Sequence, residues 1–132
     1  MFVDTSVIVA ILADEADAGR FAVKLAEAGH CYTSGLVILE AAMRLTSLLR
    51  VDPLDAEARI QKVLEEAEIS IVAIDGSIAK RAVAAFAAYG KGRGHPAQLN
   101  LADCLSYACA QAYSVPLLFK GNDFSQTDVQ VA

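Results

Sequence analysis

The sequence predicts an α/β protein with a short, mostly parallel central sheet that helices cover on both faces. Short apolar stretches alternate along the chain with segments of helical periodicity, and this alternation is typical of parallel sheets. The 132 residues are 55% apolar and contain no internal repeat, low-complexity tract or Pro/Gly/Ser-rich linker. We therefore expect residues 1–132 to form a single domain.

The first half of the chain is expected to contain two strands and three helices. "MFVD" reads as a strand that ends at Asp4, and "TSVIVAILADE" after it reads as a helix. A second helix over 16–28 stops at Gly29 and has apolar residues at the spacing i, i+4, i+7. "HCYTS" (30–34) is the next strand, and Ser34 can cap a long helix that runs to about Arg50. The residues that set the spacing in the second helix are Phe21, Leu25 and Ala28.

The second half is expected to continue the same alternation. Asp52 and Pro53 are suited to the N-cap and first position of a helix. "ISIVAI" (69–74) is the clearest strand because it is rich in β-branched residues. A helix then starts at Asp75 or Ser77 and ends at Gly90. Its expected inner face consists of Ile78, Ala82, Phe86 and Tyr89.

The C-terminal third begins with a loop over Lys91–Gln98. An apolar helix (100–113) and the strand "PLLF" (116–119) follow the loop. A last short strand is expected near Val129.

Composition excludes several classes of protein. The longest apolar run, Val7–Ala13, is far shorter than the roughly 20 residues that a membrane span needs, and no basic leader precedes it. We therefore expect a cytoplasmic protein. The three cysteines are odd in number and lie in apolar surroundings, so they read as small buried side chains. The net charge of −5 argues against a broad basic face, but not against an enzyme that meets phosphates through a metal.

Four carboxylates stand in positions that need an explanation. Asp4 ends the first strand and Asp123 lies four residues past "PLLF", so both belong to the rim where parallel strands end. Glu40 and Asp103 lie in helical segments with apolar neighbours. Each has a plain structural alternative: Asp4 as an N-cap, Asp103 as the partner of an Asn100 cap, Asp123 as a turn former, and Glu40 as an ion-pair partner of Arg44.

The four carboxylates together favour a metal site. Two carboxylates about 5 Å apart repel by about 3 kcal/mol at an effective dielectric of 20, so a cluster either takes up protons or holds a cation. Oxygen ligands without a zinc-like spacing of His or Cys suit Mg²⁺ or Mn²⁺. Such ions hydrolyse phosphodiesters, because they polarise the phosphoryl oxygen and generate hydroxide near neutral pH.

Four blocks of this sequence resemble PIN-domain ribonucleases, specifically VapC-type toxins of type II toxin–antitoxin pairs. They are "VDTS" at the N-terminus, "LE" at 39–40, "LNLADCLSYACA" at 99–110 and "PLLFKGNDFSQTDV" at 116–129. The resemblance spans almost the whole chain and implies a PIN-like three-layer α/β/α fold. It also implies a Mg²⁺- or Mn²⁺-dependent endoribonuclease that a cognate antitoxin inhibits and that commonly forms homodimers.

The resemblance also implies roles for individual residues. Asp4 and Asp103 would be the main metal ligands, and Glu40 and Asp123 would complete the catalytic set directly or through water. Thr5 and Ser6 match hydroxyl-bearing positions that orient the first carboxylate, although both can also cap the first helix. Asn122 stands where many relatives have a second acid, and no role is assigned to it.

The basic residues could contact RNA. Lys91 and Arg93, with His95, lie in a glycine-spaced loop that either binds phosphates or is simply solvated. Lys120 could meet a phosphate or pair with Asp123. Tyr107 and Tyr113 read as core or dimer contacts rather than stacking platforms.

Two other functions compete with the nuclease. A phosphoacceptor signalling domain would use Asp75 and Lys120, each just past a strand, but it would leave Glu40 and Asp103 unexplained. A non-catalytic binding module would not need the four carboxylates.

Overall fold

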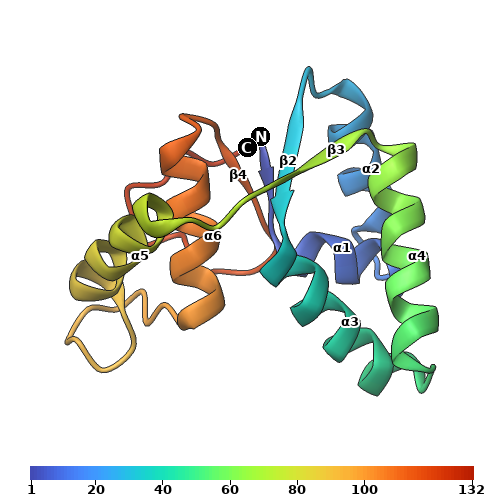
Figure 1. The fold of residues 1–132 in the computed structure, drawn as a ribbon, viewed down its shortest axis with the longest axis horizontal. Coiled ribbons are helices and arrows are strands. Elements are labelled where there is room, and N and C mark those ends of the chain that lie inside the picture. The colour runs from blue at the N-terminus through green and yellow to red at the C-terminus, as the bar shows by residue number, and fades with distance from the viewer.

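The computed structural model describes all residues, 1–132, and contains six helices around a four-stranded sheet. All strands are parallel and their order is β3-β2-β1-β4. The elements in chain order are β1 (Phe2–Val3), α1 (Thr5–Leu12), α2 (Ala18–Glu27), β2 (Cys31–Ser34), α3 (Gly35–Leu49), α4 (Pro53–Glu66), β3 (Ile69–Val72), α5 (Gly76–Tyr89), α6 (Leu101–Ala112) and β4 (Leu117–Leu118). Figure 1 shows α5 and α6 on one side of the sheet and α1, α2 and α4 on the other. The three-layer α/β/α fold is therefore confirmed.

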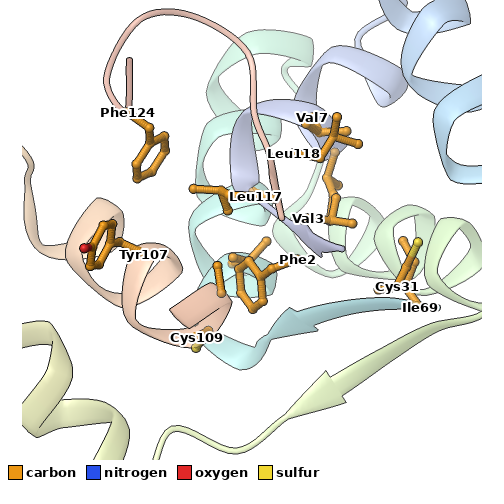
Figure 2. Close-up of a cluster of buried hydrophobic side chains, with 14 of the residues drawn as sticks. Phe2, Val3, Val7, Cys31, Ile69, Tyr107, Cys109, Leu117, Leu118 and Phe124 are labelled. Carbon is orange, nitrogen blue, oxygen red and sulfur yellow. The ribbon is translucent and has the colours of Figure 1, made fainter. Parts of the chain in front are cut away.

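The central strand β1 contributes one buried side chain to the hydrophobic core on each face of the sheet. Phe2 and Val3 are completely buried, and their side chains point in opposite directions because side chains alternate along a strand. Figure 2 shows Phe2 directed toward Cys109 of α6 and Val3 directed toward Val7 of α1. Phe2 is in register with Leu117 of β4. Although β1 has only two residues, its side chains therefore contact the helices on both faces of the sheet.

The starts of α1, α3, α4, α5 and α6 agree with the sequence predictions because each has a side-chain cap, whereas α2 begins at Ala18 without one. Asp4 caps α1, Ser34 caps α3 and Asp52 caps α4 with Pro at the first helical position. Asp75, rather than Ser77, caps α5 by accepting hydrogen bonds from the Ser77 and Ile78 amides. A polar oxygen at this position satisfies amide groups that the helix leaves unpaired.

Several element ends differ from the prediction. The first helix ends at Leu12 and not at 15, because the chain turns at Asp14, whose φ is +51°. The strand predicted over 69–74 ends at Val72, and the one predicted over 116–119 is reduced to Leu117–Leu118. The strand expected near Val129 is a single bridge between Val131 and Leu117. Central β1 has only two residues, so β4 has no longer partner with which to continue the ladder.

The predicted inner face of α5 was wrong at Phe86. The buried residues of this helix are Ile78, Ala82 and Ala85, whereas the Phe86 side chain is 46% exposed. Helices α5 and α6 pack directly on each other (Figure 1), and the small Ala85 fits this contact better than a phenyl ring. Phe86 lies about 100° further around the helix and faces outward.

The three cysteines are free and buried, as the sequence predicts. Burial raises the pKa of the Cys109 thiol to about 11 and also raises those of Cys31 and Cys104. These thiols therefore behave as small core side chains. None of the helices has both the length and the apolar character needed to cross a membrane.

Candidate functional site

The four predicted carboxylates belong to elements that meet at the carboxyl edge of the sheet. Asp4 directly follows β1 and Glu40 lies in α3, which directly follows β2. Asp103 lies in the first turn of α6, and Asp123 lies in the turns after β4. This edge is where parallel α/β proteins bind their ligands.

Asp4 is held by three hydrogen bonds. Its Oδ2 accepts from the amide and the hydroxyl of Ser6, at 3.1 and 2.7 Å. Its Oδ1 accepts from the Ser106 hydroxyl of α6 at 2.9 Å, within the buried interior. Asp4 is thus both the N-cap of α1 and a fixed carboxylate at the site, so the capping and functional interpretations are compatible.

Ser6 connects this carboxylate to the segment that carries Asp123. Its hydroxyl donates to Asp4 and accepts a hydrogen bond of 2.9 Å from the Lys120 amide, just after β4. One side chain therefore positions Asp4 and also anchors the chain three residues before Asp123.

Asp103 is the most perturbed carboxylate of the chain. It forms a reciprocal capping box with Asn100: the Asp103 amide donates to Asn100 Oδ1 at 2.8 Å, and the Asn100 amide donates to Asp103 Oδ2 at 3.1 Å. Burial, which leaves 8% of the residue exposed, raises the pKa of Asp103 to about 7. The Asn100 hydrogen bond opposes this rise in pKa, and the charges of the other three carboxylates, Asp123, Asp4 and Glu40, add to it.

The charges of Asp4, Glu40 and Asp123 each raise the pKa of Asp103, so each of these three carboxylates lies within electrostatic range of Asp103. The four carboxylates come from positions between 4 and 123, and three of them act on the fourth through their charge. A capping role alone would account for Asp103's contact with Asn100, but not for the negative charges around it. The alternative ion pair between Glu40 and Arg44 is absent from the structure.

The donor set fits a hard divalent cation. The four side chains offer carboxylate oxygens, and Thr5 Oγ1, next to Asp4 in the chain, is buried without a hydrogen-bond partner. The side chains of Glu40, half-buried, and Asp123, exposed, make no hydrogen bond that would fix their rotamers. As the side chains stand, no three acidic, histidine or cysteine groups are close enough to hold one ion together. To take part in binding an ion, Glu40 and Asp123 would have to reach it by rotation or through water.

The predicted basic residues occupy two different places. Lys120 Nζ pairs with Glu15 and, at 3.1 Å, with Asp17, so the predicted alternative that it pairs with Asp123 is wrong. Lys91 and Arg93 are exposed in the loop before α6 and make no ion pair. Among these three basic residues, Lys91 and Arg93 are the two whose charges are unpaired, and both lie in the loop that leads into α6.

The two tyrosines differ in their burial. Tyr107 is buried and its hydroxyl donates to Asp128 Oδ1 at 2.5 Å, as expected for a core contact. Tyr113 is 42% exposed and packs on the Tyr32 ring with 5.0 Å between centroids.

Sequence reasoning missed Ser106. Its hydroxyl lies three residues after Asp103 on the same face of α6, where it reaches Asp4. A lone serine in the apolar stretch "LADCLSYACA" was the available signal. The Glu15–Asp17 partners of Lys120 were also missed, and no local pattern points to them because they lie more than 100 residues away.

The phosphoacceptor alternative conflicts with the topology. Asp75 follows β3 and Lys120 follows β4, and these strands form opposite edges of the sheet. Asp75 is occupied as the cap of α5, and Lys120 is occupied by two carboxylates. The two residues therefore cannot form one phosphorylation site.

Comparisons with known proteins agree with the geometry. Residues 1–130 match the PIN domain family. The whole chain is 46% identical to ribonuclease VapC28 of Mycobacterium tuberculosis, covering 97% of that protein. It is also 42% identical to VapC ribonuclease R02377 of Rhizobium meliloti, with 97% of this chain and 98% of that protein covered.

Two solved structures share the fold. A toxin–antitoxin complex from Klebsiella pneumoniae aligns with a TM-score of 0.73 and 21% identity, over 99% of this chain and 95% of that one. The crystal structure of Mycobacterium tuberculosis VapC20, a toxin that cleaves the sarcin–ricin loop, aligns with a TM-score of 0.78 and 17% identity, over 99% and 97%.

Proposed function

Because the chain belongs to the PIN-domain family, as a VapC-type member, we propose that it is a metal-dependent endoribonuclease and the toxin of a toxin–antitoxin pair. Residues 1–132 would act as one catalytic domain in the cytoplasm. The observation that carries the proposal is the position of Asp4, Glu40, Asp103 and Asp123 on elements that meet at the carboxyl edge of the sheet, where the charges of the other three also raise the pKa of Asp103. A neighbourhood of four carboxylates is unfavourable unless a proton or a cation balances it.

Asp4 and Asp103 would hold Mg²⁺ or Mn²⁺ directly, with Glu40 and Asp123 completing the set directly or through water. A bound ion of this kind polarises a phosphoryl oxygen and supplies hydroxide near neutral pH. The chain's own contribution is to keep the carboxylates in position. Ser6 and Ser106 orient both oxygens of Asp4, and Asn100 orients Asp103.

Cleavage of RNA by the purified chain is the direct test. We expect cleavage in Mg²⁺ or Mn²⁺, loss in excess chelator, and loss in each of Asp4→Asn, Glu40→Gln and Asp103→Asn. Asp55→Asn is the matched control, because it removes the same charge from an exposed position on α4. Sequencing the 5′ ends of the fragments would identify the target RNA. Cleavage that persists in chelator would refute the metal mechanism.

Metal binding can be measured without activity. Mg²⁺ should raise the melting temperature of the wild-type chain, because a ligand that binds the folded state stabilises it. The same addition should have a smaller effect on Asp103→Asn. An equal shift in both proteins would place the ion elsewhere.

The partner that fits the site is a small antitoxin. Three large apolar side chains of α3 are exposed on the helix that carries Glu40, and they suit an apolar helix of a partner. An Arg of that partner can bind the carboxylates with its planar fork. The exposed residues are Leu39, Met43 and Leu48.

Expression of the chain alone should arrest growth, and co-expression of a short neighbouring reading frame should restore it. A soluble chain that proves harmless alone would contradict the toxin role but leave a housekeeping nuclease. A homodimer is part of the proposal, and sedimentation tests it. A non-catalytic binding module predicts RNA binding without any cleavage.

A further inference from the structure

Residues 76–102 contain no aspartate or glutamate, although the whole chain has a net charge of −5. The stretch covers α5 and the loop that leads to α6, and it ends one residue before Asp103. Its charged side chains are all basic and exposed: Lys80, Arg81, Lys91 and Arg93. The two loop cations, Lys91 and Arg93, are the ones nearest in the chain to Asp103, whereas Arg81 lines a pocket with Tyr107 and Asp128.

The loop holds Lys91 and Arg93 beside the first turn of α6. The Lys91 amide donates to the Leu99 carbonyl at 2.9 Å, and Gly90 and Leu99 form a parallel bridge. Figure 1 shows the loop connecting the outer end of α5 to the start of α6. Lys91 and Arg93 are thus anchored close to the segment Asn100–Asp103.

The exposed ring of Phe86 lies beside Arg93 of the loop. A Cβ atom on Gly90 would stand 2.2 Å from Phe86 Cδ1, so the ring rests directly against the Gly90 backbone. The Arg93 guanidinium lies over the ring, with Cζ 5.8 Å from the centroid, within the range of a cation–π contact. The ring is held in place, yet 46% of the residue stays in solvent.

Core packing does not explain Phe86, because Ile78, Ala82 and Ala85 form the buried face of α5. An exposed aromatic ring and a guanidinium plane, with Lys91 in the same loop, are the kind of surface on which an unpaired base stacks while a lysine meets a phosphate. Single-stranded RNA fits this surface better than a protein partner does, because the loop and α5 contain no Asp or Glu that could pair with a partner's cations.

We infer that Phe86 and Arg93 form a stacking platform for an unpaired nucleotide that flanks the scissile phosphate. The inference rests on the proposed ribonuclease function and adds a substrate contact outside the carboxylate site, made by Phe86 and Arg93. Lys91 binds a neighbouring phosphate. The platform binds substrate and takes no part in the chemical step.

Fluorescence offers a direct test, because the chain contains no tryptophan. Phe86→Trp, placed in an Asp103→Asn background to prevent cleavage, provides a single reporter. A short single-stranded RNA should quench its fluorescence in a saturable way, and a duplex of the same sequence should not. Tyr113→Trp is the matched control, since Tyr113 is also half-exposed but lies at the opposite end of α6. Equal quenching at both positions would overturn the inference.

Kinetics separate binding from chemistry. Phe86→Leu and Arg93→Lys should each raise KM for single-stranded RNA about tenfold and leave kcat nearly unchanged. Arg93→Lys keeps the charge but removes the planar group, so a purely electrostatic role would leave KM at its wild-type value. Val83→Ala, on the exposed side of the same helix, should change neither constant.

The outcomes distinguish this inference from the proposed function. A wild-type chain that cleaves no RNA refutes the ribonuclease proposal and removes the premise here. A wild-type chain that cleaves RNA, with KM unchanged in Phe86→Leu, refutes the platform alone. A Phe86→Leu variant that cleaves normally but loses self-association or antitoxin binding would assign the surface to a protein interface and overturn the inference.

Discussion

Asp103→Asn should make the metal-free chain more stable at neutral and alkaline pH. The pKa of Asp103 is about 7 in the folded chain and 3.8 in its ordinary environment. Between these values the folded chain binds a proton that the unfolded chain has lost, so the folded state loses stability as pH rises through this window. The full difference of about 3 pKa units corresponds to about 4 kcal/mol. Asparagine removes the charge and keeps an oxygen that can accept the hydrogen bond from the Asn100 amide.

Denaturant unfolding in chelator measures this effect. The free-energy gain of Asp103→Asn should be near 1 kcal/mol at about pH 4.5 and should approach about 4 kcal/mol at about pH 8. Asp55→Asn is the control, because Asp55 is exposed and makes no side-chain hydrogen bond. A gain that does not depend on pH, or a loss of stability at both pH values, would refute the reasoning, since either result means that burial and the other carboxylates do not disfavour the Asp103 charge.

Three further predictions concern residues outside the predicted metal ligands. Ser106→Ala should cost about 1–3 kcal/mol of unfolding free energy, because it leaves an oxygen of buried Asp4 without its donor; an unchanged midpoint in denaturant would show that this hydrogen bond is dispensable. Tyr107→Phe should cost about 1 kcal/mol in the same measurement, since it removes the hydroxyl that donates to Asp128, and the Asp128→Asn variant should then add little to it. The three thiols should react with a thiol reagent at neutral pH only as fast as the chain unfolds, because burial raises their pKa values; rapid labelling of the native protein would contradict their burial.

Local sequence signals predicted the order of the elements and the starts of the helices. A cap such as Ser34 or Asp52 acts within one helical turn, so the residues that decide it are adjacent in the chain. The four carboxylates could be recognised for a similar reason, because each stands out against its own apolar neighbours. Their joint spacing also carried the family resemblance, which predicted the layered fold.

Contacts between distant segments were decided only by the tertiary structure. Ser106 meets Asp4 across 102 residues and Lys120 meets Glu15 across 105, and nothing in either local sequence specifies such a partner. Phe86 faces solvent because α5 packs on α6 through its alanines, and helical periodicity alone does not choose between two adjacent faces of a helix that is apolar almost all round. The raised pKa of Asp103 has the same origin, because burial and three distant charges produce it and both exist only once the chain has folded.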